Sequence, residues 1–164
     1  MSFRAKTSLI GLVSDTHGLL RPEAVAALAG VDLIVHAGDV GKPDVLDGLR
    51  AIAPVVAVRG NVDHGTWADE LPEREIVRTS TLTLYVLHDL AELDGDPVAE
   101  GVGVVVSGHS HRPVIEWRGS VLYVNPGSIG PRRFSLPVSL ALLRVDGPAP
   151  EARLVEVIAA PRRE

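Results

Sequence analysis

The chain of 164 residues is long enough for one well-buried core and too short for two full domains, so we predict a single domain over residues 1–164. Its net charge of −5 and pI near 5.7 argue against a protein that coats nucleic acid or an anionic membrane. The absence of cysteine excludes disulfides, thiolate metal sites and cysteine nucleophiles. Because no apolar stretch approaches the ~20 residues of a spanning helix, and none near the start suits a signal peptide, we expect a cytoplasmic protein.

The first third of the chain alternates apolar runs with helical spacing. Strands are expected at Leu9–Val13, Leu33–His36 and Val55–Val58, and helices at Pro22–Leu28 and Pro43–Ile52. Strands that alternate with helices in this way indicate parallel βαβ units.

The chain after Pro72 is rich in strand-like runs instead. We expect strands at Arg74–Thr79, Leu82–Leu87, Val102–Val106, Val114–Trp117, Val121–Asn125, Ser139–Val145 and Arg153–Ile158. The first two are separated by Ser80 and Thr81 and predict a hairpin, and a short helix is expected around Val98–Glu100. The whole pattern predicts a mixed α/β fold with two packed sheets flanked by helices.

Five polar clusters come directly after predicted strands. They are Asp15-Thr-His17, Gly38-Asp39, Gly60-Asn61-Val-Asp63, His88-Asp89 and Gly108-His109-Ser-His111. Because the carboxyl ends of parallel strands meet at one edge of an open sheet, these clusters are expected to converge in space.

The side chains in these clusters suit metal ions. The candidate ligands are two carboxylates, one amide and four imidazoles: Asp15, His17, Asp39, Asn61, His88, His109 and His111. Oxygen and nitrogen donors without sulfur favour Mn, Fe, Zn, Co or Ni over a structural zinc site. Seven ligands exceed the needs of one ion but suffice for two ions ~3.5–4 Å apart that share a carboxylate.

Such a centre would attract phosphate despite the acidic surface. Two divalent ions bring four positive charges, and only Asp15 and Asp39 supply fixed negative charge. A water that bridges the ions has its pKa lowered, from 15.7 to about 7 in favourable zinc sites, and becomes a hydroxide nucleophile. No serine or cysteine nucleophile is then needed.

The order Asp-x-His, Gly-Asp, Gly-Asn-x-Asp, His, Gly-His-x-His resembles that of the calcineurin-like metallophosphoesterases. Asn125-Pro-Gly-Ser128 resembles a segment of their small bacterial and archaeal phosphodiesterase branch. The resemblance implies a four-layer α-β-β-α sandwich of two mixed β-sheets, with the metal site at the carboxyl ends of the strands.

The resemblance also divides the ligands between two ions. It implies that Asp15, His17, Asp39 and His111 hold one ion, whereas Asp39, Asn61, His88 and His109 hold the other, with Asp39 bridging. Manganese is the ion that we expect first, with nickel, iron, zinc and cobalt as alternatives.

Two positions depart from the family pattern. Val62 follows Asn61, where the phosphatase and nuclease-like branches usually have a histidine that assists the leaving group. Loss of such a general acid costs ~10²–10⁴-fold for poor leaving groups. His64 is either a substitute for it or a surface histidine. Asp89 stands where the family usually has glycine, and it either orients His88 or points into solvent.

Other polar residues are candidates for supporting the ligands or contacting the substrate. These are Asp63, Asp89, Asn125 and Arg132. Arg132 and its neighbour Arg133 could hold a phosphate oxygen or simply be solvated. His36, inside a predicted strand, is expected to be a core histidine or a support and not a ligand.

The resulting hypothesis is a dinuclear metal-dependent phosphodiesterase acting on a small phosphate ester. Its catalytic groups would be Asp39, Asn61 and His109, acting through the bridging hydroxide. The missing histidine after Asn61 favours diesters with good leaving groups over phosphoproteins. Two alternatives stay open: a scaffold of the same fold, similar to the related retromer subunit, and a nuclease, which the acidic charge and few aromatic residues disfavour. A homo-oligomer is also left open by the resemblance.

Overall fold

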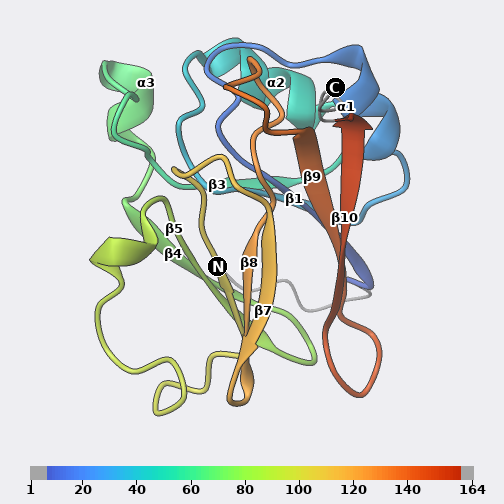
Figure 1. The fold of residues 1–164 in the computed structure, drawn as a ribbon. Coiled ribbons are helices and arrows are strands. Elements are labelled where there is room, and N and C mark those ends of the chain that lie inside the picture. Colours follow the sequence, from blue (N-terminus) through green and yellow to red (C-terminus); the bar gives the residue numbers. More distant parts are fainter. Residues whose placement is uncertain (1–6, 160–164) are drawn as a thin grey trace.

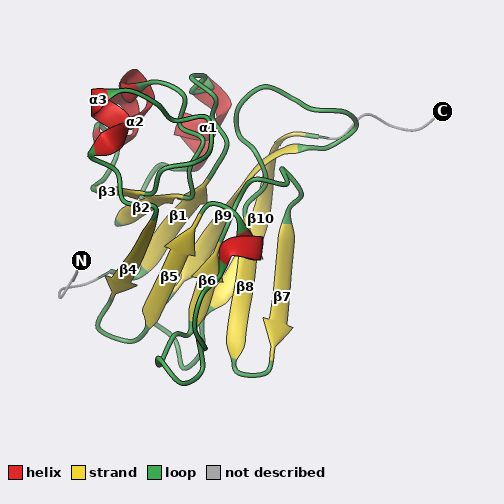
Figure 2. Cartoon of the chain, turned by 90° about the vertical axis from the view of Figure 1, so that its left-hand side faces the viewer, coloured by secondary structure: helices red, strands yellow, loops and turns green. Residues whose placement is uncertain are grey.

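Two five-stranded sheets pack face to face in the computed structural model, which describes residues 7–159. The first sheet has the order β10-β9-β1-β2-β3 and the second the order β4-β5-β6-β8-β7. Figures 1 and 2 show the two sheets side by side, with the α-helices gathered near one end of the first. This arrangement confirms the predicted α/β sandwich.

The strands lie close to the predicted runs. Their bounds are β1 Leu9–Val13, β2 Leu33–His36, β3 Val55–Ala57, β4 Arg74–Arg78, β5 Thr83–Leu87, β6 Val104–Val106, β7 Val114–Arg118, β8 Val121–Asn125, β9 Val138–Arg144 and β10 Glu151–Ile158. Strands β1, β2 and β3 pair in parallel, and so do β5, β6 and β8. Both sheets are mixed, because β9 and β10 in one and β4 and β7 in the other run antiparallel to their neighbours. The hairpin predicted around Ser80 and Thr81 joins β4 to β5.

The helices pack on the outer face of the first sheet. They are α1 Pro22–Ala27, α2 Pro43–Arg50 and α3 Thr66–Asp69. In α2, Val45, Leu46 and Leu49 share the buried face, while Asp44 in the first turn and Arg50 in the last turn suit the helix dipole.

The outer face of the second sheet has a thinner cover. A 3₁₀ helix, η1 Leu90–Glu92, and the loop after it pack over Tyr85 and Val105. The helix predicted around Val98–Glu100 is wrong, because these residues form a turn. A run of three or four residues carries too little periodicity to distinguish the two, and the same reason explains why α3 and η1 were not predicted.

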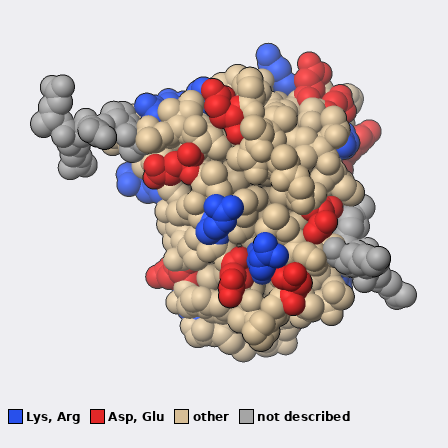
Figure 3. Space-filling view, turned by 90° about the vertical axis from the view of Figure 1, so that its right-hand side faces the viewer, with Lys and Arg blue, Asp and Glu red and all other residues tan. Residues whose placement is uncertain are grey.

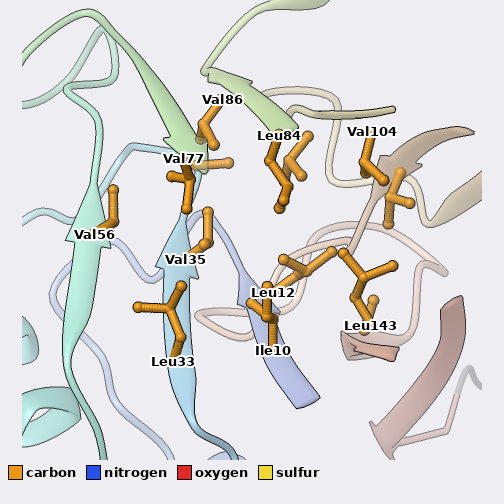
Figure 4. Packing of buried hydrophobic residues seen from close by; sticks show 14 of the residues in the cluster. Ile10, Leu12, Leu33, Val35, Val56, Val77, Leu84, Val86, Val104 and Leu143 are labelled. Carbon is orange, nitrogen blue, oxygen red and sulfur yellow. The ribbon is translucent and has the colours of Figure 1, made fainter. Parts of the chain in front are cut away.

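The main core fills the space between the sheets. Ile10, Leu12 and Val35 of the first sheet face Leu84 and Val104 of the second in Figure 4, and all five are fully buried. Burial of each such side chain contributes about 1.5–3 kcal/mol. This rigid base supports the loops at the carboxyl ends of the parallel strands.

Candidate metal centre

The loops after the parallel strands hold their polar side chains in an unusual backbone conformation. Among residues 7–159, six non-glycine residues have positive φ. Five of them are predicted metal ligands: Asp15 (55°), His17 (46°), Asp39 (56°), His109 (69°) and His111 (60°). The left-handed region costs an L-residue roughly 1–2 kcal/mol, and such residues gather at functional sites. The tertiary structure therefore keeps these loops in place against a local preference.

Asp15, His17 and His111 form the first cluster. One donor atom from each lies within 4.8 Å of the others, a spacing that could hold a metal ion. His111 Nε2 lies 3.3 Å and His17 Nε2 lies 3.7 Å from Asp15 Oδ1. Asp15 is fully buried, so this cluster lies deep at the end of β1.

Asp39, His88 and His109 form the second cluster, again with donor atoms within 4.8 Å of one another. His88 Nε2 is 3.2 Å from Asp39 Oδ2. The side chain of His109 is 47% exposed, so this cluster opens to the surface. Asn61 lines a cavity together with His88 and His109, two residues of the second cluster.

Asp39 belongs to the second cluster and also faces the first. Its Oδ1 accepts a hydrogen bond of 3.0 Å from the backbone N–H of Val62. Its Oδ2 is left facing His88 Nε2 at 3.2 Å and His17 Nε2 at 3.8 Å. One oxygen is therefore held by the backbone while the other faces a histidine of each cluster, as a bridging carboxylate requires.

Among the described residues 7–159, three buried polar atoms at this site have no hydrogen-bond partner. They are Asp15 Oδ1, His88 Nε2 and His111 Nδ1. A buried polar atom without a partner costs about 1–3 kcal/mol, so its presence needs a reason. His88 Nδ1 lies 2.7 Å from the carbonyl of Ala37, to which it donates, and this bond directs the unpaired Nε2 toward Asp39. Carboxylate oxygen and imidazole nitrogen with unused lone pairs fit divalent metal ions.

The two aspartates favour the ionised form. Burial by itself raises the pKa of Asp15, but contacts with His111 and Ser14 outweigh it and lower that pKa below the ordinary value. Burial likewise raises the pKa of Asp39, but His88 and the Val62 N–H lower it further. Both carboxylates are therefore negative near neutral pH.

The histidines differ in their preference for a proton. Burial lowers the pKa of His17, an effect that Arg133 reinforces, so the ring favours the neutral form that binds metal. Burial also lowers the pKa of His88, but the neighbouring Asp39 outweighs it and raises that pKa. An ion that binds to His88 must therefore displace a proton whenever the ring is charged.

His36 joins the two aspartate loops and is fully buried. Its Nδ1 accepts from the N–H of Gly38 at 3.1 Å, so Nε2 carries the proton and donates to the hydroxyl of Thr16 at 3.0 Å. The Thr16 hydroxyl donates in turn to the carbonyl of Val40. Burial lowers the pKa of His36 to about 4, which keeps the ring neutral. His36 thus supports the residues next to Asp15 and Asp39.

Asp63 and Asn125 also hold loops of the centre. Asp63 accepts from the backbone N–H groups of Val40, Gly41 and Gly60, which ties the Asp39 loop to the Asn61 loop. Asn125 donates to the Gly108 carbonyl and the Ser110 hydroxyl, and so braces the loop that carries His109 and His111. Both side chains bind the backbone or a neighbouring hydroxyl and leave the clusters to the other residues.

The remaining candidates lie around the rim. Asp89 accepts from the N–H of Ala91 at the start of η1, and its other oxygen is 3.8 Å from His109 Nε2. Arg132 donates to the carbonyl of Ala159, whereas Arg133 is close enough to influence His17. Val62 and His64 are exposed.

Several residues at the centre were not anticipated from the sequence. The Ser14 hydroxyl donates to Asp15 Oδ2 at 2.7 Å, and the Ser128 hydroxyl donates to the Asp15 carbonyl at 2.8 Å. Arg59, Glu73 and Glu92 line the cavity beside His88. Ser128 ends the segment Asn125-Pro-Gly-Ser128, but its contact with Asp15 was not predicted, and no motif marks the other residues. Their position depends on how the two sheets pack.

Within residues 7–159, none of the helices has the length and apolar character required to cross a membrane.

Comparison with known proteins agrees with the geometry. Residues 9–147 match the family model of the calcineurin-like phosphoesterase superfamily domain. A probable metallophosphoesterase of Methanocaldococcus jannaschii is 40% identical over 135 residues, which cover 74% of this chain and 68% of the relative. The phosphodiesterase YfcE of Escherichia coli K12 is 29% identical over 164 residues, with 81% of this chain and 85% of that protein covered. The solved structure of Chaetomium thermophilum Vps29 has a similar fold, with a TM-score of 0.73, 22% identity and coverage of 94% of this chain and 100% of that one.

Proposed function

Since the chain belongs to the calcineurin-like phosphoesterase superfamily, we propose that it is a phosphodiesterase that uses two divalent metal ions to hydrolyse a small phosphate diester. The observation that supports this most is the pair of clusters around Asp39, with buried donor atoms left unpaired in both. The name of the relative YfcE supports the preference for a diester.

Asp15, His17, Asp39 and His111 would hold one ion, and Asp39, Asn61, His88 and His109 the other. When bound, such ions supply positive charge for the phosphate oxygens and the transition state and lower the pKa of a water molecule. The chain positions them: His88 is oriented by the carbonyl of Ala37, and Asp39 by the N–H of Val62. Manganese is the ion that we propose first.

Val62 shapes the expected substrate preference. An exposed valine beside Asn61 cannot donate a proton to a departing alcohol, so esters with good leaving groups should react best. His64 lies two residues further on and is exposed, without a hydrogen bond to any ligand among the described residues.

A test compares the hydrolysis of bis-p-nitrophenyl phosphate with that of p-nitrophenyl phosphate, using protein that is stripped of metal and then given Mn, Ni, Zn or Mg. Metal-dependent cleavage of the diester is expected. Asp39→Asn changes a proposed metal ligand itself. It should therefore lower the rate of diester cleavage by more than the roughly 10–100-fold that is typical when a residue that only hydrogen-bonds to a ligand is lost. Asp47→Asn makes the same change on the exposed surface of α2 and should keep the activity.

A scaffold function is the second candidate, because the similar structure of Vps29 shows that this fold also occurs in a protein named for vacuolar sorting. The full set of ligands argues against it here. Binding of two ions per chain without turnover of either ester would support the scaffold and contradict our proposal.

A nuclease is disfavoured by the net negative charge of the chain. The net charge is −5, and the face in Figure 3 carries acidic and basic side chains interspersed, without a continuous basic strip. A nucleic-acid backbone needs such a strip to neutralise its phosphates.

A further inference from the structure

A second cavity, which we call the apolar cavity, shares His109 and Asp89 with the cavity that Asn61 and His88 line. It lies where β6 and β8 end and β7 begins, and its volume is about 190 Å³. The half-exposed ring of His109, a proposed metal ligand, borders both cavities. A phosphate bound at the metal centre would therefore have the apolar cavity next to it.

The wall of the apolar cavity is formed largely by apolar side chains. Leu90, Val114 and Tyr123 meet there, and Val114 is 41% exposed. The guanidinium carbon of Arg118 lies 4.4 Å from the centroid of the Tyr123 ring, and this contact holds the ring in place. Exposed apolar side chains that gather in a hollow, unlike those scattered singly, are typical of ligand sites.

The polar side chains at the end of this cavity are already used by the protein. The amide nitrogen of Asn125 donates to the Gly108 carbonyl and to the Ser110 hydroxyl. The amide oxygen of Asn125 accepts from the N–H of Gly127. This wall therefore favours a ligand group that needs no hydrogen bonds.

Charge at the apolar cavity is balanced. Asp89 is the single carboxylate among the residues that line it, and its oxygens face the Ala91 N–H and, at 3.8 Å, His109 Nε2. An ion held by the second cluster would offset its negative charge. Arg118, which covers Tyr123, is paired with Glu116 Oε2 at 3.1 Å. Apolar contact, and not net charge, therefore decides what fits.

We propose that the apolar cavity binds an uncharged substituent of the substrate, about the size of one aromatic ring, while the phosphate lies at the metal centre. The inference rests on the proposed function, which supplies the phosphate site. An apolar cavity of about 150 Å³ can hold benzene. The volume of about 190 Å³ therefore suits a single ring.

Binding of two phosphonates tests this without any need for turnover. Benzylphosphonate and methylphosphonate present the same group to the metal centre, and only the first carries a ring. Calorimetry on manganese-loaded protein should show that benzylphosphonate binds about tenfold more tightly, because its ring is partly buried. Its heat capacity of binding should also be more negative.

Substitutions at Val114 locate the preference. Val114→Trp should fill the cavity and bring the ratio of the two affinities close to one, while methylphosphonate binds as in wild type. Val114→Thr keeps the shape but adds a hydroxyl, and should lower the ratio about threefold. Ile115→Trp places the same large ring on the opposite face of β7, outside the cavity, and should leave the ratio unchanged.

Equal affinities for the two phosphonates in wild type, or a ratio that Val114→Trp does not lower, would overturn the inference. Equal weakening of both ligands in Val114→Trp would also overturn it, because the substitution would then act on the metal centre.

Hydrolysis of bis-p-nitrophenyl phosphate separates this inference from the proposed function. Preference for benzylphosphonate without cleavage of the diester would support the apolar cavity as a binding site and contradict the phosphodiesterase. Cleavage of the diester without that preference would do the reverse. Failure of both phosphonates to bind would overturn the inference together with the phosphate site on which it rests.

Discussion

The imidazole of His36 holds two aspartate loops while remaining neutral. Its Nδ1 accepts a hydrogen bond from Gly38, and its Nε2–H donates to Thr16, so a second proton on Nδ1 would point at another donor. Burial adds to this cost and lowers the pKa of His36 to about 4, compared with an ordinary value of 6.5. This residue therefore makes the stability of the centre depend on pH.

We predict that metal-free protein loses stability as the pH falls from 6.5 to about 4, in part because of His36. In this window the unfolded chain binds a proton at His36 and the folded chain does not, so the free energy of unfolding falls with pH by up to roughly 3 kcal/mol. Above pH 6.5 the ring is neutral in both states and this contribution is constant.

Urea unfolding at several pH values, on wild type and on His36→Gln, would measure this effect. The variant should be less stable at pH 7 and lose less stability on acidification. His64→Gln, on the exposed surface, should follow the wild type. Parallel curves for wild type and His36→Gln would show that this imidazole does not cause the loss.

At the scale of elements, the loops after the strands depend on close approach of their backbones. A Cβ on Gly60 would lie 2.1 Å from Asp39 Oδ1, and one on Gly108 would lie 2.0 Å from Ser14 Oγ. Glycine at these positions lets two loops from different strands meet at each aspartate. The glycines of the motifs therefore act through packing between loops.

We predict that Gly60→Ala displaces Asp39 and weakens metal binding by at least about tenfold, with a loss of about 1–3 kcal/mol of stability. Gly103→Ala is a matched control, because a Cβ there has its nearest neighbour at 3.6 Å. Metal content after dialysis and urea unfolding would measure the two effects. Equal metal retention by both variants would contradict the role of close approach at Gly60.

Strands and helices could be predicted where their apolar residues form a run or recur at a regular spacing. Buried strands such as β2 and β8 show as apolar runs, and α2 shows through the spacing of Val45 and Leu49. The helix expected at Val98–Glu100 was wrong, because these residues form a turn. The 3₁₀ helix η1 was not predicted; its first turn is capped by the Asp89 side chain, which accepts from the N–H of Ala91. Short elements are determined by their surroundings, so a sequence window does not reveal them.

At the scale of the whole molecule, the two sheets bring their strand ends to one edge, and bound ions would join them. Asp15 and Asp39 follow strands of the first sheet, and His88 and His109 follow strands of the second. Any ion held by Asp39 and His88 therefore crosslinks the sheets.

We predict that metal stabilises the fold. A free ion at 100 times its dissociation constant would add about 2.7 kcal/mol, which corresponds to a rise in Tm of about 5–10 °C for a chain of this size. Thermal unfolding with manganese and with EDTA would measure it. Calcium, which prefers oxygen ligands, should give a smaller rise; equal rises with calcium and manganese would argue against imidazole ligands.

The sequence by itself predicted the fold class, the kinds of side chain that could bind metal and their order along the chain. Apolar runs predict buried strands, and the polar clusters that follow them predict a site at the strand ends, because both features are local. The match over residues 9–147 confirms the family resemblance, and the division of the ligands between two ions stays a prediction from that resemblance.

Only the tertiary structure revealed the contacts between residues that lie far apart in the chain. It showed that Asp39 faces both clusters, that Asp63 and Asn125 brace loops, and that Arg132 binds the Ala159 carbonyl. It also placed Glu92 beside Asn61 and His109 in one cavity. These relations join residues far apart in the chain through the packing of two sheets, so no local pattern in the sequence encodes them.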